Sequence, residues 1–447
     1  MTIAENLAAL DKQEIQERNL VNNFLPFRQQ RANSPKYDFE AIAGSVLSAA
    51  LRKELKNNID LDKFETSVFS RLRKKLTSNE IDALIHKMYF EKDTLGLFKV
   101  SPEFLIFKAQ DAEISLNKHV SQVLRSLILV DTISFPEIIN EVSFLEQELI
   151  AQLQESLDQL SLVAPETPYL PFMADCFSKD LLFLIKNPSY FLQNIQLFFS
   201  LYTFLYSSQL ALNINDWIKK PTSKPLFFIL ETEKASLERK NVREAFRPLQ
   251  NNAADLFPIL SMLEYLNQPQ NKKAIKAPLW QVYEYIEGMN EHEKQSVHDA
   301  LTKLCGRYRE KRGLDEITNY PDTTESIFKL LTSTAKKIFS QRGTGQFTVN
   351  SKFVNAFENE IASHFTQNRG RSGRILTIPQ DYFLLLTNLS IGNRERIQFQ
   401  DLLSEFKKRG IWFDRQSEQA IIKLLERIGN IEKMSDSGDA VYVRKTL

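Results

Sequence analysis

The chain has 447 residues, of which 43% are hydrophobic, and it carries a formal net charge of only +1. This length is enough for two to four domains, and the hydrophobic content excludes a largely disordered chain. The near-neutral charge excludes a protein-wide basic surface of the kind that many nucleic-acid-binding proteins have.

Residue usage favours a mainly α-helical, multidomain fold. The sequence has 13 glycines against 32 phenylalanines, and few glycines indicate few tight turns. Cys176 and Cys305 are the only cysteines, too few for a zinc site or a disulfide scaffold, so we expect reduced thiols. Residues 1–5 have no basic start and residues 11–18 are heavily charged. We therefore expect no export signal and predict a cytoplasmic protein.

Residues 1–135 are predicted to form an N-terminal helical domain. A polar linker at residues 28–35 follows the first helix. Ser101 before Pro102 is typical of a helix start further along. One amphipathic helix has apolar side chains at helical spacing, namely Leu61, Phe64, Val68, Leu72 and Leu76.

Residues 136–313 are predicted to form a central, aromatic-rich helical domain that begins with a long helix over residues 136–162. Residues 189–212 contain no charged side chain, although a membrane span needs about 20 predominantly apolar residues. Four amides interrupt the segment: Gln193, Asn194, Gln196 and Gln209. We therefore predict a buried core helix or a subunit interface and no membrane partner, with a spanning helix as the weaker alternative.

Residues 314–374 are predicted to be a helical connector that ends in a basic loop. Arg369, Arg371 and Arg374 lie in this loop with two glycines and no acidic residue. Arginines in a flexible loop can neutralise phosphates or enter a groove of a duplex. The loop is therefore a candidate DNA contact directly before the last domain.

Residues 375–447 begin with the elements of a winged-helix domain. A helical stretch starts at Pro379, and a short alternating run follows at residues 396–399. The next helix, over residues 400–409, stops at Gly410, since glycine favours the left-handed position after a helix end.

The remaining elements complete the pattern. Asp414 caps another helix with apolar side chains at helical spacing, and Gly429 ends it. Residues 430–434 and 440–444 alternate, and the Gly- and Asp-containing turn at residues 435–439 favours a hairpin. Helix, strand, helix, turn, helix and hairpin are the elements of a winged helix.

Basic and amide side chains here are the candidates for DNA contact, because the second helix of such a turn presents its N-terminal half to bases and phosphates. Besides Arg369, Arg371 and Arg374, the candidates are Arg394, Arg396, Lys407, Lys408, Arg409, Arg415, Gln416, Gln419 and Lys423. Glu418 lies among them, and Asp436 and Asp439 at the presumed turn would repel phosphate. A protein-docking use of the domain therefore stays open.

No phosphate-binding motif is complete. Residues 342–346 contain two glycines but lack the lysine that would reach the phosphates. His292 and His298 are six positions apart, whereas zinc-binding imidazoles on one helix face are four apart. We predict no cofactor and no metal.

Residues 227–234 are similar to a nuclease strand that ends in acid-x-Lys, but Thr232 stands where the acid should be. Asp216 and Glu231 would be the metal ligands of such a centre. A solvated helix start is the interpretation that we favour for this segment. We therefore predict a non-enzyme, with a nuclease centre at Asp216 and Glu231 as the weakest alternative.

Residues 408–414, 424–428 and 433–444 together resemble the C-terminal end of the DptG family. The most distinctive part is Ser435-Asp436-Ser437-Gly438-Asp439-Ala440. This resemblance implies a subunit of the bacterial restriction machinery that works with DNA phosphorothioation. It implies ATPase subunits of the same system and double-stranded DNA as partners. The alternative is a protein-binding scaffold whose winged helix docks a partner subunit without contacting DNA.

Overall fold

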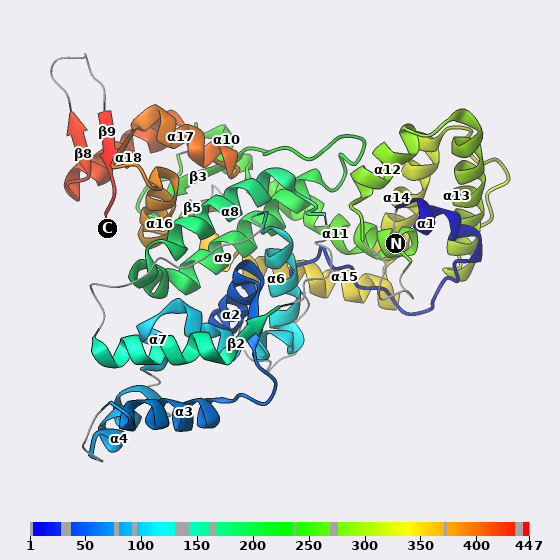
Figure 1. Ribbon diagram of the computed structural model, residues 1–447. Helices are drawn as coiled ribbons and strands as arrows, with labels where there is room; N and C mark the ends of the chain where they lie inside the picture. Colours follow the sequence, from blue (N-terminus) through cyan, green and yellow to red (C-terminus); the bar gives the residue numbers. More distant parts are fainter. Residues whose placement is uncertain are drawn as a thin grey trace.

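The computed structural model describes residues 3–27, 37–75, 80–91, 96–129, 143–160, 167–236, 238–268, 276–370, 373–433 and 441–446. Within these residues α-helices dominate, and they are accompanied by small sheets of two, four and three strands. The predicted mainly α-helical fold is therefore confirmed. Three groups of elements extend from the centre: α3 with α4, α12 with α13, and α17 and α18 with β8 and β9 (Figure 1).

The N-terminal part of the chain consists of short helices and one small pair of antiparallel strands. Its helices are α2 (Phe39–Leu51), α3 (Leu61–Arg73), α4 (Glu80–Ile85), α5 (Leu97–Val100), α6 (Ser115–Ser126) and α7 (Phe144–Ser156). In α3 the Asp60 side chain caps the first turn, and Phe64, Val68 and Leu72 are buried as their spacing predicts. Leu76 and the linker at residues 28–35 lie outside the described residues.

The helix predicted over residues 136–162 is shorter in the structure. A capping box of Ser143 and Glu146 starts α7, which ends at Ser156. There the chain becomes extended, because β2 (Leu157–Gln159) pairs antiparallel with β1 (Lys53–Leu55). Residues 136–142 and 161–162 lie outside the described residues.

The N-terminal segment, with α1 (Ile3–Ala8), packs against the central helices. Arg307 Nη2 of α13 donates to the Leu10 carbonyl at 2.7 Å, and Asn22 Nδ2 donates to Glu264 of α11 at 2.6 Å. These hydrogen bonds therefore join the predicted N-terminal domain (residues 1–135) to the predicted central domain (residues 136–313).

Further helices accompany α9 (Pro188–Asn213) in the part of the chain before the C-terminal elements. They are α8 (Pro171–Ile185), α11 (Phe246–Leu266), α12 (Leu279–Glu287), α13 (Glu291–Lys311), α14 (Thr324–Ser340) and α15 (Gly345–Ala356). Helices α2, α8, α11 and α16 (Gln380–Ile391) contact α9, and Phe198 and Phe204 are fully buried. The predicted core helix is therefore confirmed, and its covering comes from the same chain.

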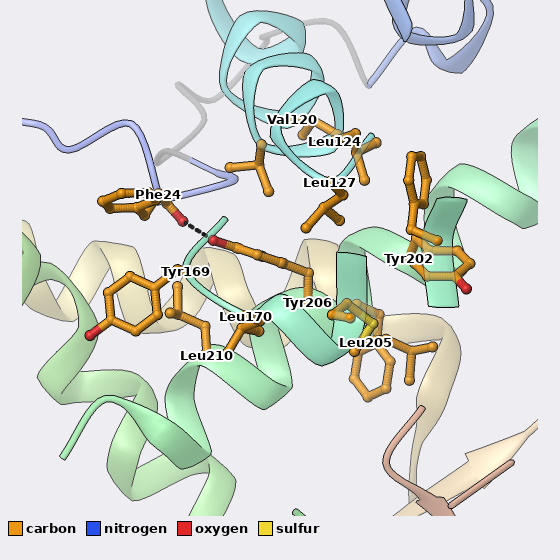
Figure 2. Close-up of a cluster of buried hydrophobic side chains, with 14 of the residues drawn as sticks. Phe24, Val120, Leu124, Leu127, Tyr169, Leu170, Tyr202, Leu205, Tyr206 and Leu210 are labelled. Atoms are coloured by element: carbon orange, nitrogen blue, oxygen red, sulfur yellow. Dashed lines mark hydrogen bonds between the residues drawn. The ribbon is translucent and has the colours of Figure 1, made fainter. Parts of the chain in front are cut away.

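Several polar groups of α9 have hydrogen-bond partners within the chain. Figure 2 shows Tyr206 among leucines of several segments, with its hydroxyl donating to the Phe24 carbonyl oxygen at 3.1 Å. The Gln209 amide exchanges two hydrogen bonds with the Lys224 backbone, at 2.8 and 2.9 Å, whereas Gln193 and Gln196 are exposed. None of the described helices is long and apolar enough to span a membrane.

A four-stranded sheet, absent from the sequence prediction, joins the centre to the C-terminal part. Its order is β4 (Thr366–Asn368), β5 (Arg374–Ile378), β3 (Leu226–Leu230) and β7 (Ile411–Trp412), and β5, β3 and β7 are parallel. The helix start favoured for residues 227–234 is thus wrong. The apolar run Leu226–Leu230 forms a central strand with neighbours on both sides, as apolar runs in parallel sheets do.

The C-terminal helices and strands that the sequence predicts occur in the predicted order, with β7 as an additional strand where a turn was predicted. After α16 come β6 (Arg396–Gln398), α17 (Phe399–Lys408), β7, α18 (Arg415–Arg427), β8 (Ile431–Lys433) and β9 (Val441–Arg444). Strand β9 pairs antiparallel with both β6 and β8, and the predicted turn at residues 435–439 lies outside the described residues. Gly410 has a left-handed φ of +84°, and an added Cβ would meet the Gln209 amide at 2.1 Å. Only glycine fits there.

Candidate nucleic-acid interface

A buried ion pair fixes α17 to the central helices. Arg409, directly after α17, donates to both Asp180 carboxylate oxygens of α8, at 2.5 and 2.9 Å. The two side chains are 4% and 1% exposed, and the Tyr202 hydroxyl donates to the same carboxylate. Arg409 is thereby placed inside the protein, not on the surface for which it was predicted, and its guanidinium cannot reach a phosphate in this conformation.

A second ionic cluster fixes the start of α18. Arg239, which precedes α10 (Lys240–Glu244), donates to the Asp414 carboxylate at 2.6 and 2.8 Å, and to Glu233 at 2.9 Å. Ser417 also receives a hydrogen bond from Arg239, at 2.6 Å. Burial raises the pKa of Asp414, but hydrogen bonds from Arg239 and Ser417 outweigh it and hold that pKa below its ordinary value. The first turn of α18 is therefore fixed beside the end of β3.

The outer face of α18 carries exposed polar side chains. Arg415, Gln416, Gln419 and Lys423 are all exposed. Residues three or four positions apart lie on the same side of a helix, while Ser417, Ile421, Leu424 and Leu425 are buried on the opposite side. These four sequence candidates are thus the ones that the structure brings together on one surface.

A hollow of about 410 Å³ lies beside this face. Its lining comes from α18, the start of α17 and β9: Gln398, Phe399, Gln400, Arg415, Glu418, Gln419, Ile422 and Val441. No side chain caps the first turn of α17, and backbone amides at a helix start favour an anion. An arginine and an uncapped helix start therefore border the same hollow, while Glu418 opposes an anion there.

Four other candidates stay at the surface but have partners within the protein. Arg394 donates to the Ile391 and Ser390 carbonyls at 3.0 and 2.5 Å and so caps the end of α16. Arg396 pairs with Glu432 at 2.8 Å, and Lys408 pairs with Glu405 at 2.7 Å. The Lys407 ammonium lies 4.9 Å from the centre of the Trp412 ring. A phosphate would compete with these contacts.

The basic loop is held against the protein. Arg369 donates to the Glu231 carbonyl at 2.5 Å. Arg374 donates to the Glu358 carboxylate at 2.8 Å and lies 4.7 Å from the centre of the Phe246 ring. Arg371 lies outside the described residues. Phosphate binding by Arg369 or Arg374 would therefore replace existing interactions, which makes this loop a weaker candidate than α18.

Two exposed lysines in a loop that contacts α17 were not among the sequence candidates. Lys219 and Lys220 are exposed in the loop between α9 and β3, and this loop contacts α17 because Ser223 Oγ donates to the Lys407 carbonyl at 2.6 Å. Two adjacent lysines are too short a run to stand out in the sequence. Only the fold brings this loop to the end of α17.

The suggested nuclease ligands do not converge. Asp216 accepts a hydrogen bond from Lys224 at 2.7 Å, just before β3, whereas Glu231 follows the other end of that strand. A five-residue strand spans roughly 16 Å. Among the described residues, no group of three or more His, Cys, Asp and Glu side chains is placed to hold a metal ion.

No model of a known protein family matches the chain, and no curated protein is significantly similar to it. The resemblance to the DptG family therefore stays a prediction.

Proposed function

We propose that the chain is a non-catalytic, DNA-contacting subunit of a restriction complex, and that its C-terminal elements act as a winged helix on duplex DNA. The connectivity supports this proposal, because β9 pairs between β6 and β8 after two consecutive helices. The observation that carries it is the exposed polar face of α18, whose opposite face is anchored in the protein.

In this proposal the N-terminal half of α18 enters the major groove. The Gln416 and Gln419 amides suit the paired donor and acceptor of adenine, and Arg415 suits the two acceptors of guanine. Lys423 and the uncapped start of α17 would contact phosphates. Because Arg409 and Arg239 hold this surface in place, little conformational entropy is lost on binding.

The resemblance to the DptG family adds the biological setting. It supports a cytoplasmic, bacterial subunit that works with ATPase subunits in phosphorothioation-dependent restriction, an antiviral defence. Cleavage would then belong to another subunit.

Binding of the full chain to unrelated duplexes at several salt concentrations tests the proposal. Lys423→Gln should lower the slope of log affinity against log salt by up to about 0.9, the value for one lost phosphate contact. Gln416→Ala with Gln419→Ala should leave the slope unchanged and reduce preference among sequences by about 1–3 kcal/mol per lost base contact. Wild-type protein without affinity for any duplex at about 50 mM salt would refute DNA contact.

Protein docking is the second candidate. The apolar side chains of Phe399, Ile422 and Val441 line the hollow beside Glu418, which suits a protein surface better than a phosphate. If an ATPase subunit of the same system occupies the hollow, Ile422→Asp should abolish its binding. A variant that binds the ATPase subunit normally would contradict this candidate.

A further inference from the structure

A second hollow, of about 470 Å³, lies between α13 and the residues that directly precede α14. The side chains that α13 contributes to it are three or four positions apart, so they lie on one face of that helix. We call it the α13 hollow. Helices α13 and α18 lie at opposite ends of the molecule (Figure 1), so this hollow is separate from the candidate DNA interface.

Two buried polar atoms at the α13 hollow have no hydrogen-bond partner among the described residues. His298 lines the hollow and is 8% exposed, and its Nδ1 is one of these atoms. The other is the hydroxyl oxygen of Thr302, one turn further along α13. Burying a polar atom without a hydrogen bond is costly, and native proteins satisfy nearly all such atoms. The pair therefore indicates a bound group that supplies the missing hydrogen bonds.

Tyr320 lines the hollow on the side opposite α13. Gly306 follows Thr302 by one turn, and a Cβ added there would lie 3.1 Å from the Tyr320 hydroxyl oxygen. The small residue at this position therefore lets the tyrosine come close to α13. Aromatic rings such as this one attract cations through their faces.

The charges of the lining favour a cation over an anion. Asp299 and Asp322 are exposed and form no ion pair with a described residue; Asp299 accepts a hydrogen bond only from the Gln295 amide, at 2.9 Å. Lys303 also lines the hollow, but its ammonium pairs with Asp11 of the N-terminal segment at 3.7 Å. Two carboxylates without an ionic partner repel an anion and attract a cation.

We propose that the α13 hollow binds a small organic cation whose N–H groups donate to Asp299, Asp322 and Thr302. Ammonium and guanidinium groups carry donors only, whereas carboxylates, a hydroxyl oxygen and one nitrogen of the neutral His298 ring are acceptors. The volume lies within the range of roughly 300–1,000 Å³ that small-molecule sites have. This inference does not depend on the proposed contact with DNA.

Calorimetric titration of the full chain at fixed ionic strength tests the class of ligand. Putrescine, a short diamine, is the probe. Butanediol has the same carbon chain with hydroxyls in place of the ammonium groups, and succinate is the anionic control. Putrescine should bind at a single site, and the two controls should not bind measurably. Equal binding of butanediol would mean that the hollow takes hydroxyl groups, and no binding of putrescine would mean that water alone satisfies the buried atoms. Either result overturns the proposal, as does binding of succinate.

Variants locate the binding site. Thr302→Val removes one acceptor and should weaken putrescine binding about two- to tenfold. Asp299→Asn with Asp322→Asn should weaken it by about two- to thirtyfold in total, as expected for two exposed ion pairs. Asp158→Asn with Asp175→Asn is the matched control, because both residues are exposed without an ion pair to a described residue and lie in β2 and α8. The control should keep the wild-type affinity.

Unchanged affinity in both hollow variants would place the site elsewhere and overturn the proposal. An equal fall in the control would indicate general attraction to acidic side chains, with the same consequence. Thr302→Val should not lower Tm, because its hydroxyl has no partner to lose; if that variant does not fold, the Asp299 and Asp322 variant carries the test. The salt slope of DNA binding should be the same in this variant as in the wild type, so failure of this proposal and failure of the α18 proposal are distinguishable.

Discussion

Replacing Arg409 by methionine should destabilise the protein without weakening its DNA contact. The change leaves the Asp180 carboxylate, which is 1% exposed, without its neutralising partner. Burial opposes the charge on Arg409, but Asp180 outweighs that effect and holds the pKa of Arg409 well above its ordinary value. Removing one partner of a buried pair costs about 3–5 kcal/mol, because the other charge stays buried and uncompensated.

This cost predicts the size of the melting shift. Unfolding entropy is about 2.1 cal/mol/K per residue near 60 °C, so 447 residues that unfold as one unit should lose roughly 3–5 °C in Tm. Differential scanning calorimetry measures the shift. If only the C-terminal elements unfold in the transition, the Tm should fall further, because the same loss of free energy is divided by a smaller entropy of unfolding.

A double variant separates charge burial from lost packing. Asp180→Asn with Arg409→Met leaves no buried charge and keeps a carbonyl that can accept from the Tyr202 hydroxyl. Its Tm should lie above that of Arg409→Met alone. An unchanged Tm in the single variant, or no recovery in the double variant, would refute the reasoning. A reduced salt slope in folded Arg409→Met would return Arg409 to the DNA-contact candidates.

Three further predictions concern single side chains. Burial raises the pKa of Glu360 from 4.5 to about 7. The folded state therefore binds more protons than the unfolded state between these values, and stability falls as pH rises through this window; Glu360→Gln should raise Tm more at pH 8 than at pH 5, and an equal effect at both would contradict this. Arg239→Met should cost about 3 kcal/mol and speed amide exchange in the first turn of α18, whereas unchanged protection there would show that the Asp414 contacts are dispensable. Phe204→Ala, at a fully buried ring stacked 4.3 Å from Phe365, should lower the free energy of unfolding by about 3–5 kcal/mol in urea titration. The exposed Leu84→Ala control should change it by less than about 0.5 kcal/mol.

Local signals predicted the helices well where one short segment holds all the information. The spacing of Phe64, Val68 and Leu72 predicted α3, because a helix is closed by hydrogen bonds four residues apart. Gly410 and Asp414 likewise predicted the end of α17 and the start of α18. The absence of charge in residues 189–212 predicted a buried helix, and the amides argued against a membrane span.

Tertiary structure alone decided the central sheet. Strands β3, β5 and β7 come from segments around residues 228, 376 and 411, and no periodicity within one segment indicates which distant segment it pairs with. Parallel strands also need long connections, which leave no hairpin signal. The segment at residues 227–234 was therefore misassigned, although its apolar run is typical of a buried strand.

The sequence by itself determined which residues are basic and which helices they belong to, but not the direction in which they point. Lys407, Lys408 and Arg409 form one run, yet Lys408 stays exposed while Arg409 is bound to Asp180, 229 residues away. The loop that carries Lys219 and Lys220 contacts the end of α17 through the hydrogen bond from Ser223 to the Lys407 carbonyl. Whether a charge faces solvent or a buried partner depends on the packing of α8, α9 and α17 together, since the ion pair forms only where all three helices meet.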